Sequence, residues 1–218
     1  MAEANLLTQF SNDLADVHER VTPSLVQIRR GGRGIGAGSI WTSDGLLLTN
    51  AHVVDARGRV AADLSVRLSD GRDLPAEVVA VDPHDDLAAL RVAGESFQPI
   101  ELGDSAALHA GQVVLAFGFP YGVTGGATVG AVIGESDLPQ SGRRGRRWLA
   151  ASLHLRPGHS GGPMVDAEGR LVGINTMMNG PDVGVAVPVN AAREFLLRVQ
   201  AGSRIGPITT TGDRVVQV

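Results

Sequence analysis

Three short segments of this 218-residue chain contain the residue types that nucleophilic catalysis requires. His52 lies in the apolar segment 48–54, and Asp86 directly precedes a second apolar run. Ser160 lies in the glycine-rich segment 157–163. A nucleophilic serine needs a base within hydrogen-bond reach and a third group that fixes the tautomer of that base. The three segments therefore predict a catalytic serine with a histidine base and an orienting aspartate.

The turn around Ser160 also offers backbone hydrogen-bond donors. Gly158, Gly161 and Gly162 lack Cβ atoms, so the chain can curl until two amides point into one concavity. Such a pair of amides stabilises the oxyanion that forms when a serine attacks a carbonyl group. We therefore expect an oxyanion hole made by the amides of Gly158 and Ser160.

Other groups of polar residues carry weaker signals. Asp82 and Asp85 lie close to Asp86 in the sequence, and we expect them to cap or solvate the turn. His154 and His159 could hold a metal ion together with His52, but two loop histidines without another nearby ligand are more typical of solvated side chains. We therefore expect no metal and no other cofactor.

Composition excludes several classes of protein. The chain has 19 basic and 23 acidic residues, a formal net charge of −4, whereas nucleic-acid-binding domains are usually strongly basic. All the basic residues are arginine, which excludes Schiff-base chemistry and a serine–lysine dyad. The absence of cysteine excludes a thiol nucleophile and disulfide bonds.

No apolar run approaches the length of about 18 residues that a membrane span needs. The opening Met1-Ala2-Glu3 does not look like the start of a signal peptide. We therefore expect no membrane span. The location stays open, with the cytoplasm expected if the chain is complete and the cell envelope or periplasm if an export segment was removed.

Hydrophobic periodicity indicates the elements that must position these residues. Helical spacing of apolar residues predicts an amphipathic helix over residues 4–20 and a second helix that begins at an Asn190 cap. Between them, short β-prone runs bounded by turn residues fall into two groups of about six. The runs are 25–28, 35–41, 46–48, 64–68, 76–81 and 87–92, then 112–117, 127–133, 148–153, 164–165, 171–176 and 183–187.

Two such groups predict an all-β fold, either two antiparallel six-stranded β-barrels or a sandwich, with a helix at each end. The order histidine, aspartate, serine along the chain belongs to the chymotrypsin-like double barrel. We expect a helical segment at 1–22, a first barrel at 23–108, a second barrel with the C-terminal helix at 109–200, and a tail at 201–218.

The chain resembles the protease domain of the HtrA/Deg serine proteases over about residues 20–198. The matching motifs are Gly36-Ala37-Gly38-Ser39, segment 48–54, Asp86-Leu87-Ala88, segment 157–163, Gly173-Ile174-Asn175-Thr176 and Val187-Pro188-Val189-Asn190. The resemblance implies a chymotrypsin-like fold in which His52 is the general base, Asp86 orients it and Ser160 is the nucleophile. It also implies the oxyanion hole at Gly158 and Ser160.

The chain departs from the family pattern at three places. His159 stands where the family usually has asparagine, and residues 151–154 read Ala-Ser-Leu-His instead of Thr-Asp-Ala-Ala. The stretch after Arg198 is too short for the PDZ domain that most members carry. We therefore expect a protease domain without a PDZ domain.

The resemblance implies a serine endopeptidase that cleaves unfolded or damaged proteins without a cofactor. Family members form trimers through N-terminal segments, and Leu6, Phe10 and Leu14 offer an apolar stripe for a homotrimer. Two alternatives use the same scaffold: a proteolytically silent chaperone or binding protein, and an esterase. Reaction with a fluorophosphonate separates the first from an active enzyme, and comparison of peptide with ester substrates separates the second.

By the resemblance, the primary specificity pocket is walled by segments 153–157, 176–178 and 184–186. The expected substrate-binding residues are His154 near its base and, along its walls, Thr176, Met177, Met178, Val185 and Ala186. These segments contain no aspartate or glutamate, so a substrate lysine or arginine would lack a partner. We therefore expect cleavage after small or branched apolar side chains.

Overall fold

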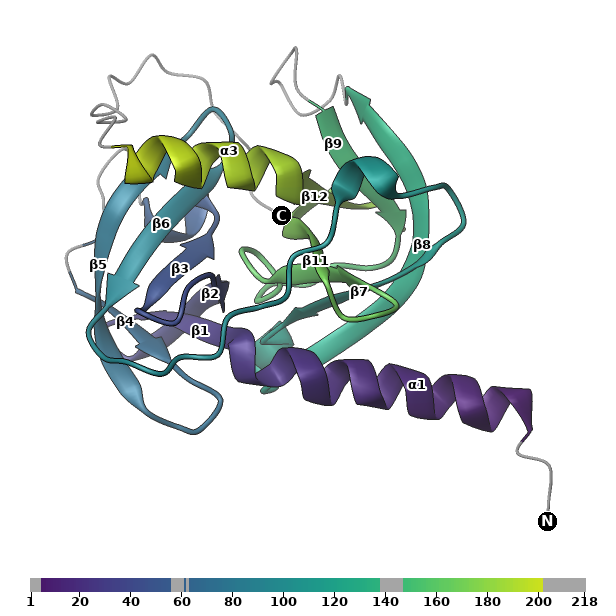
Figure 1. Ribbon diagram of the computed structural model, residues 1–218, viewed down its shortest axis with the longest axis horizontal. Helices are drawn as coiled ribbons and strands as arrows, with labels where there is room; N and C mark the ends of the chain where they lie inside the picture. The colour runs from purple at the N-terminus through teal and green to yellow at the C-terminus, as the bar shows by residue number, and fades with distance from the viewer. Residues whose placement is uncertain (1–4, 56–60, 62, 138–146, 202–218) are drawn as a thin grey trace.

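The computed structural model describes residues 5–55, 61, 63–137 and 147–201. In this part of the chain the strands form two closed six-stranded barrels, with the order β1-β2-β3-β6-β5-β4 in one and β10-β11-β12-β9-β8-β7 in the other (Figure 1). The predicted two-barrel, all-β fold is confirmed, and the sandwich alternative is wrong. The predicted tail lies outside the described residues, except for Ala201.

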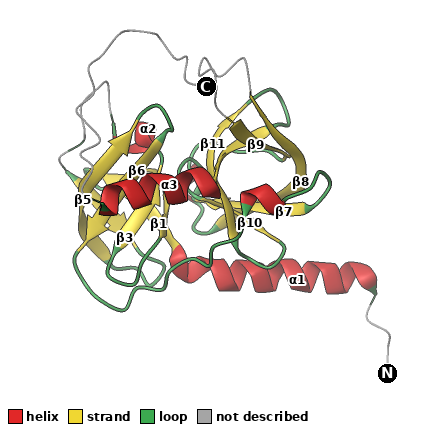
Figure 2. Cartoon of the chain, turned by 45° about the horizontal axis from the view of Figure 1, so that its top comes forward, coloured by secondary structure: helices red, strands yellow, loops and turns green. Residues whose placement is uncertain are grey.

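The strands of the first barrel are β1 (Leu25–Arg30), β2 (Arg33–Ile40), β3 (Leu46–Thr49), β4 (Leu64–Arg67), β5 (Asp73–Asp82) and β6 (Leu87–Val92). Those of the second are β7 (Val113–Gly118), β8 (Gly126–Asp137), β9 (Arg147–Ser152), β10 (Pro163–Asp166), β11 (Leu171–Met178) and β12 (Gly184–Pro188). The α-helices are α1 (Leu6–Val21), α2 (Ala51–Val54) and α3 (Val189–Gln200). Figure 2 shows the barrels side by side, with α3 over their junction.

Strand β3 explains how the barrels are joined. Leu47 faces the interior of the first barrel, whereas Leu46 and Leu48 face an apolar cluster shared by the two barrels and α3. Both faces of β3 are therefore buried, which accounts for the unbroken apolar run in the sequence. From α3, Phe195 and Leu196 enter the same cluster. Because this cluster draws on both barrels, it fixes how they sit relative to each other.

Helix α3 begins earlier than the sequence predicts. Its N-cap is Pro188, so the prediction that Asn190 caps the helix is wrong. The cap forms at a proline because α3 follows β12 without an intervening turn, and Pro188 still has extended backbone angles. Asn190 lies in the first turn, where its side-chain amide donates to the Asp104 carboxylate at 2.7 Å.

Helix α1 uses only its C-terminal half for packing. Asn5 caps it, with the side-chain oxygen accepting from the Leu7 amide at 3.1 Å. Val17 and Val21 are buried against the second barrel, but Leu6 and Phe10 stay 81% and 47% exposed. Figure 1 shows the N-terminal half extending past the barrels. None of the helices among the described residues has the length and apolar character needed to cross a membrane.

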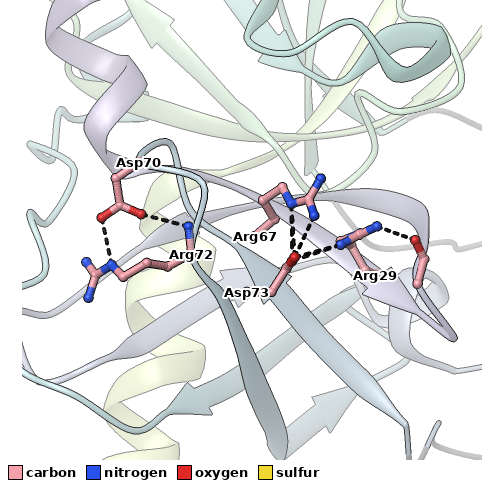
Figure 3. Close-up of polar contacts among 6 residues, drawn as sticks. Arg29, Arg67, Asp70, Arg72 and Asp73 are labelled. Carbon is pink, nitrogen blue, oxygen red and sulfur yellow. Dashed lines mark hydrogen bonds and ion pairs between the residues drawn. The ribbon is translucent and has the colours of Figure 1, made fainter.

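Ion pairs hold the outer face of the first barrel where β1, β4 and β5 meet (Figure 3). The Asp73 carboxylate pairs with Arg67 at 2.5 Å and with Arg29 at 2.9 Å. Hydrogen bonds from Arg67, and then from Arg29, hold the pKa of Asp73 below its usual range. Asp70 accepts from the Arg72 amide and guanidinium, which lowers the pKa of Asp70 and fixes the turn between β4 and β5.

Replacing Phe195 tests the role of α3 in joining the barrels. The ring is fully buried, so Phe195→Ala is expected to lower the free energy of unfolding in urea by about 3–5 kcal/mol. Leu197 lies two residues away on the same helix and is 65% exposed, so Leu197→Ala is the matched control. That control should change the free energy by less than about 0.5 kcal/mol. Equal losses for the two variants would contradict a structural role for the buried face of α3.

Candidate active site

His52 is held at the junction of β3 and the single-turn helix α2. Its neighbours Ala51, Val53 and Val54 are buried and fix the turn, while the His52 side chain remains 40% exposed. The alternation of buried and exposed residues therefore anchors the backbone and leaves the imidazole at the surface.

Asp86 lies beneath His52 and is 1% exposed. Its carboxylate accepts from the His52 amide at 3.1 Å and contacts the imidazole Nδ1 at 2.9 Å. Its φ of +50° is unusual for a residue with a side chain, and such backbone conformations cluster at functional sites. A carboxylate on Nδ1 holds the proton there, so the lone pair of the imidazole is on Nε2, as a general base requires.

The neighbouring aspartates serve the turn between β5 and β6. Asp82 accepts from the Asp85 amide at 3.0 Å and pairs with Arg198 at 3.0 Å. Asp85 pairs with His84 at 2.9 Å. In the described part of the chain, one group has ligand atoms close enough together to share a metal ion: Asp82, His84 and Asp85. The Arg198 guanidinium already pairs with the Asp82 carboxylate of this group.

Ser160 belongs to the second barrel, and backbone hydrogen bonds hold its turn to strands of both barrels. Its carbonyl accepts from the Ala37 amide of β2 at 2.8 Å. The Gly161 amide donates to the Asn175 carbonyl of β11 at 2.8 Å. The Ser160 hydroxyl donates to the Thr176 carbonyl at 3.2 Å, not to His52. Catalytic hydrogen bonds are often long or misaligned without substrate, and a rotation about Cα–Cβ redirects this hydroxyl.

The residues before Ser160 form a tight turn. The His159 amide donates to the Arg156 carbonyl at 2.9 Å, which closes a four-residue turn. Pro157 takes its second position and Gly158, with φ +105°, its third, as a type II turn requires. The Pro157 carbonyl accepts from the Tyr121 amide at 3.2 Å. Because the peptide is trans, the Gly158 amide points away from Tyr121.

All four carbonyls from residue 157 to residue 160 accept backbone hydrogen bonds. The Gly158 carbonyl accepts from Phe119, and the His159 carbonyl from Gly162, both at 2.9 Å. The amides of Gly158 and Ser160, by contrast, donate to no group among the described residues. Two unused donors in one rigid turn are what an oxyanion hole requires.

Asn50 connects the two barrels behind these residues. It is fully buried, and its side-chain amide donates to the Asp86 carbonyl at 2.9 Å and to the Thr176 hydroxyl at 3.1 Å. We did not identify Asn50 from the sequence. The available signal was a polar residue within an otherwise apolar segment, two positions before His52.

Some of the predicted specificity residues lie beside Ser160 or along β11, and others lie elsewhere. Thr176 is buried beside the serine, and Met177 and Met178 are half-buried along β11. The Met178 sulfur accepts from the Leu155 amide at 3.1 Å, which brings Leu155 to the predicted pocket. His154 is half-exposed, and its Nδ1 lies 3.8 Å from Asp182, so it is on the surface and not at the base of a pocket.

Val185 and Ala186 do not line a pocket. Both are fully buried, Val185 in the cluster between the barrels and Ala186 inside the second barrel. The prediction that their side chains form pocket walls is wrong. The physical reason is that β12 is covered on both faces, so neither side of the strand faces solvent.

A cavity of about 330 Å³ lies beside the serine turn, between that turn, β2 and Tyr121. Gly158 and Pro157 form one wall, Gly36 and Ile35 of β2 a second, and Tyr121 a third. A second cavity, of about 480 Å³, is lined by residues that include Asp104, Asp166 and Arg193. Neither cavity is lined by a residue of the predicted triad, but the smaller one is lined by Gly158 of the predicted oxyanion hole and is therefore the one relevant to chemistry at Ser160.

Comparison with known proteins places this geometry in a family. Residues 36–174 match the family model described as Trypsin-like peptidase domain. The chain belongs to the trypsin-like peptidases. Among curated proteins it is 35% identical to the mitochondrial serine protease HTRA2 of Drosophila virilis over 180 residues, which is 81% of this chain and 42% of that protein. HTRA2 of Bos taurus is 35% identical over 204 residues, 86% of this chain and 43% of that protein.

Solved structures give the same assignment. The HtrA-type protease AlgW with a decapeptide superposes with a TM-score of 0.79 at 27% identity, covering 88% of this chain and 68% of that one. AlgW with a tripeptide has the same TM-score at 30% identity, covering 88% and 64%. The predicted HtrA-type protease domain is confirmed. The chain spans less than half the length of the curated relatives it matches.

Gly161 offers a steric test of the contact between the serine turn and the first barrel. Its φ is +82°, and an added Cβ would collide with the Thr49 hydroxyl and the Ala37 carbonyl. Gly161→Ala is therefore expected to displace Ser160 and to slow its labelling by a fluorophosphonate about 10²-fold or more.

Gly71→Ala is the matched control for backbone strain. Gly71 has a φ of +89° with no atom within 4 Å of an added Cβ, so its variant carries similar strain without a collision. It should label at the rate of the unaltered chain. Equal labelling of both variants would contradict the steric argument.

Proposed function

We propose that this chain is a serine endopeptidase in which Ser160 is the nucleophile, His52 the general base and Asp86 its orienting partner. The observation that carries the proposal is a buried carboxylate on His52 Nδ1 together with two unused amides beside Ser160. The trypsin-like family assignment supports the same chemistry.

The reaction starts when the Ser160 hydroxyl turns from the Thr176 carbonyl towards His52. Its oxygen bonds to the substrate carbonyl carbon while its proton passes to His52 Nε2. The Gly158 and Ser160 amides stabilise the negative oxygen that results. His52 then gives the proton to the leaving amine, the C–N bond breaks, and an acyl-enzyme remains. Water, deprotonated by His52, hydrolyses the acyl-enzyme and frees Ser160.

The substrate is expected to cross the serine from β11 to β2. Ser160 lies between Thr176, which holds its hydroxyl, and Ala37, which holds its carbonyl. The acyl half would therefore follow the edge of β11 at Met177, and the leaving half would enter the cavity beside Ile35. Extended, unfolded chains can cross such a path, so unfolded protein is the proposed substrate.

The side chain before the cut is proposed to be small and apolar. Methionine side chains adapt to different shapes, and Met177 and Met178 carry no charge for a substrate cation. Asp182, the acidic residue closest after them in the sequence, is strongly exposed and faces His154. Discrimination among valine, alanine, leucine and isoleucine should be weak, because one methylene group is worth about 1–3 kcal/mol.

The silent-chaperone and esterase alternatives are less well supported. A binding protein has no need for a buried carboxylate on Nδ1 or for unused amides at the serine. The cavity beside Gly158 can receive the chain that follows a peptide bond, which a simple ester does not need. A faster rate with an ester than with a matched peptide, and no cleavage of unfolded protein, would favour the esterase.

Substitutions in the triad test the proposal on an unfolded protein substrate. Ser160→Ala and His52→Ala are expected to lower kcat/KM by about 10⁴-fold or more, and Asp86→Asn by about 10⁴-fold through the wrong imidazole tautomer. Asp85→Asn is the matched control and should retain activity. Mass spectrometry of the products should place the cuts after apolar residues. Full activity in Ser160→Ala would refute the nucleophile, whereas cuts after arginine or lysine would refute only the pocket.

We also propose that the chain forms a homotrimer through α1. Leu6, Leu7 and Phe10 are 81%, 75% and 47% exposed on the half of α1 that extends past the barrels (Figure 1). A contiguous apolar surface of this kind is typical of a protein interface. The number of chains is taken from the resemblance to the HtrA/Deg proteases, which form trimers through N-terminal segments, and a ring of three chains has closed symmetry.

Light scattering at micromolar concentration tests the trimer. The mass should correspond to three chains of 22.6 kDa each. Replacing both Leu6 and Phe10 with serine should give a monomer, because the apolar stripe is lost. Leu197→Ser, which removes an apolar side chain exposed elsewhere, should leave the mass unchanged. A monomer mass for the unaltered chain would refute the proposal.

A further inference from the structure

His159 is a buried titratable residue beside the nucleophile that the reaction does not use. It is 1% exposed, although it directly precedes Ser160. Its Nδ1 lies 3.0 Å from the Arg156 amide nitrogen. The imidazole therefore accepts a backbone hydrogen bond within the turn that forms the oxyanion hole.

This bond closes the turn a second time. The His159 amide donates to the Arg156 carbonyl, and the Arg156 amide donates to the His159 imidazole. Pro157 and Gly158 lie between these two residues, so both bonds constrain the peptide that aims the Gly158 amide. An amide N–H can donate to Nδ1 only if that nitrogen carries no proton, so this bond assigns the proton of the neutral imidazole to Nε2, which is buried and has no hydrogen-bond partner among the described residues.

The surroundings favour the neutral form. Burial lowers the pKa of His159, and the Arg156 guanidinium and the His154 imidazole lower it further. The Arg156 carbonyl, 3.1 Å from Nδ1, acts in the opposite direction. From β7, Gly118 packs against the His159 backbone and brings no charge. His154 in turn faces the exposed carboxylate of Asp182.

We infer that His159 is a positioning residue that keeps the oxyanion hole formed only while its imidazole is neutral. Protonation places an N–H on Nδ1 opposite the Arg156 N–H, so the bond that closes the turn is lost. The Gly158 amide is then no longer held in the orientation that the oxyanion hole requires. Because the pKa is lowered, the neutral form persists below the usual histidine value of about 6.5, and the hole is lost as the pH falls through the lowered value.

Two substitutions separate the hydrogen bond from the titration. In His159→Asn, the side-chain oxygen is bonded to Cγ as Nδ1 is, so it can accept from the Arg156 amide but does not titrate. In His159→Leu, no acceptor remains. The inference rests on the proposed hydrolytic activity, so kcat and KM are measured against pH for peptide cleavage.

In the unaltered chain the His159 imidazole must lose its proton for the oxyanion hole to form, whereas the side chain of His159→Asn does not titrate. At acid pH, the limiting slope of log kcat/KM against pH should therefore be one unit greater in the unaltered chain than in His159→Asn. His159→Leu should lower kcat by about 10²-fold at every pH, with KM unchanged, because the amides act on the transition state. Equal limiting slopes in the unaltered chain and His159→Asn, or unchanged kcat in His159→Leu, overturn the inference and leave the proposed function intact.

A spectroscopic measurement tests the inference even without turnover. In a Ser160→Ala background, nuclear magnetic resonance should show His159 with its proton on Nε2 at neutral pH. The amide signals of Arg156 and Gly158 should titrate with the same midpoint as the His159 imidazole, and should not titrate in His159→Asn. If these amide signals do not change as the His159 imidazole titrates, the inference is overturned. Absence of hydrolysis in the unaltered chain would refute the proposed function alone.

Discussion

The hydrogen bond from the Ala37 amide to the Ser160 carbonyl is the contact on which the active site depends. It is the point where a strand of the first barrel holds the proposed nucleophile of the second. Gly161 lies against the same strand, where no side chain fits. Asn50 adds a second link by donating to both Asp86 and Thr176. The residues of the proposed triad therefore come together only when the two barrels adopt one relative orientation.

This relative orientation of the barrels is set by apolar packing and not by the polar residues themselves. The cluster between the barrels contains side chains from β3, β6, β9, β11, β12 and α3, nearly all fully buried. Close-packed interiors tolerate little displacement, so this cluster fixes the distance between His52 and Ser160. The polar contacts then select one orientation within the space that packing leaves.

The sequence was sufficient to predict the two barrels and the three triad positions as candidates. Turn residues mark the strand ends, and histidine, aspartate and serine each lie in a distinctive local segment. The specificity pocket was harder to predict, because strand alternation does not reveal that β12 is covered on both faces at Val185 and Ala186. The role of Asn50 depends on contacts across the barrel junction, which local sequence does not encode.

Burial of both faces of β3 has a consequence for local stability. The strand pairs with β2 on one side and β6 on the other, so its amides can exchange with solvent only when much of the first barrel opens. His52 lies in α2, which begins two residues after the end of this strand. In the serine turn, by contrast, the amides of Gly158 and Ser160 donate to no described group, so they can exchange without opening of a barrel. The proposed base is thus attached to a slowly exchanging unit of the fold, whereas the proposed oxyanion hole is made of amides that exchange readily.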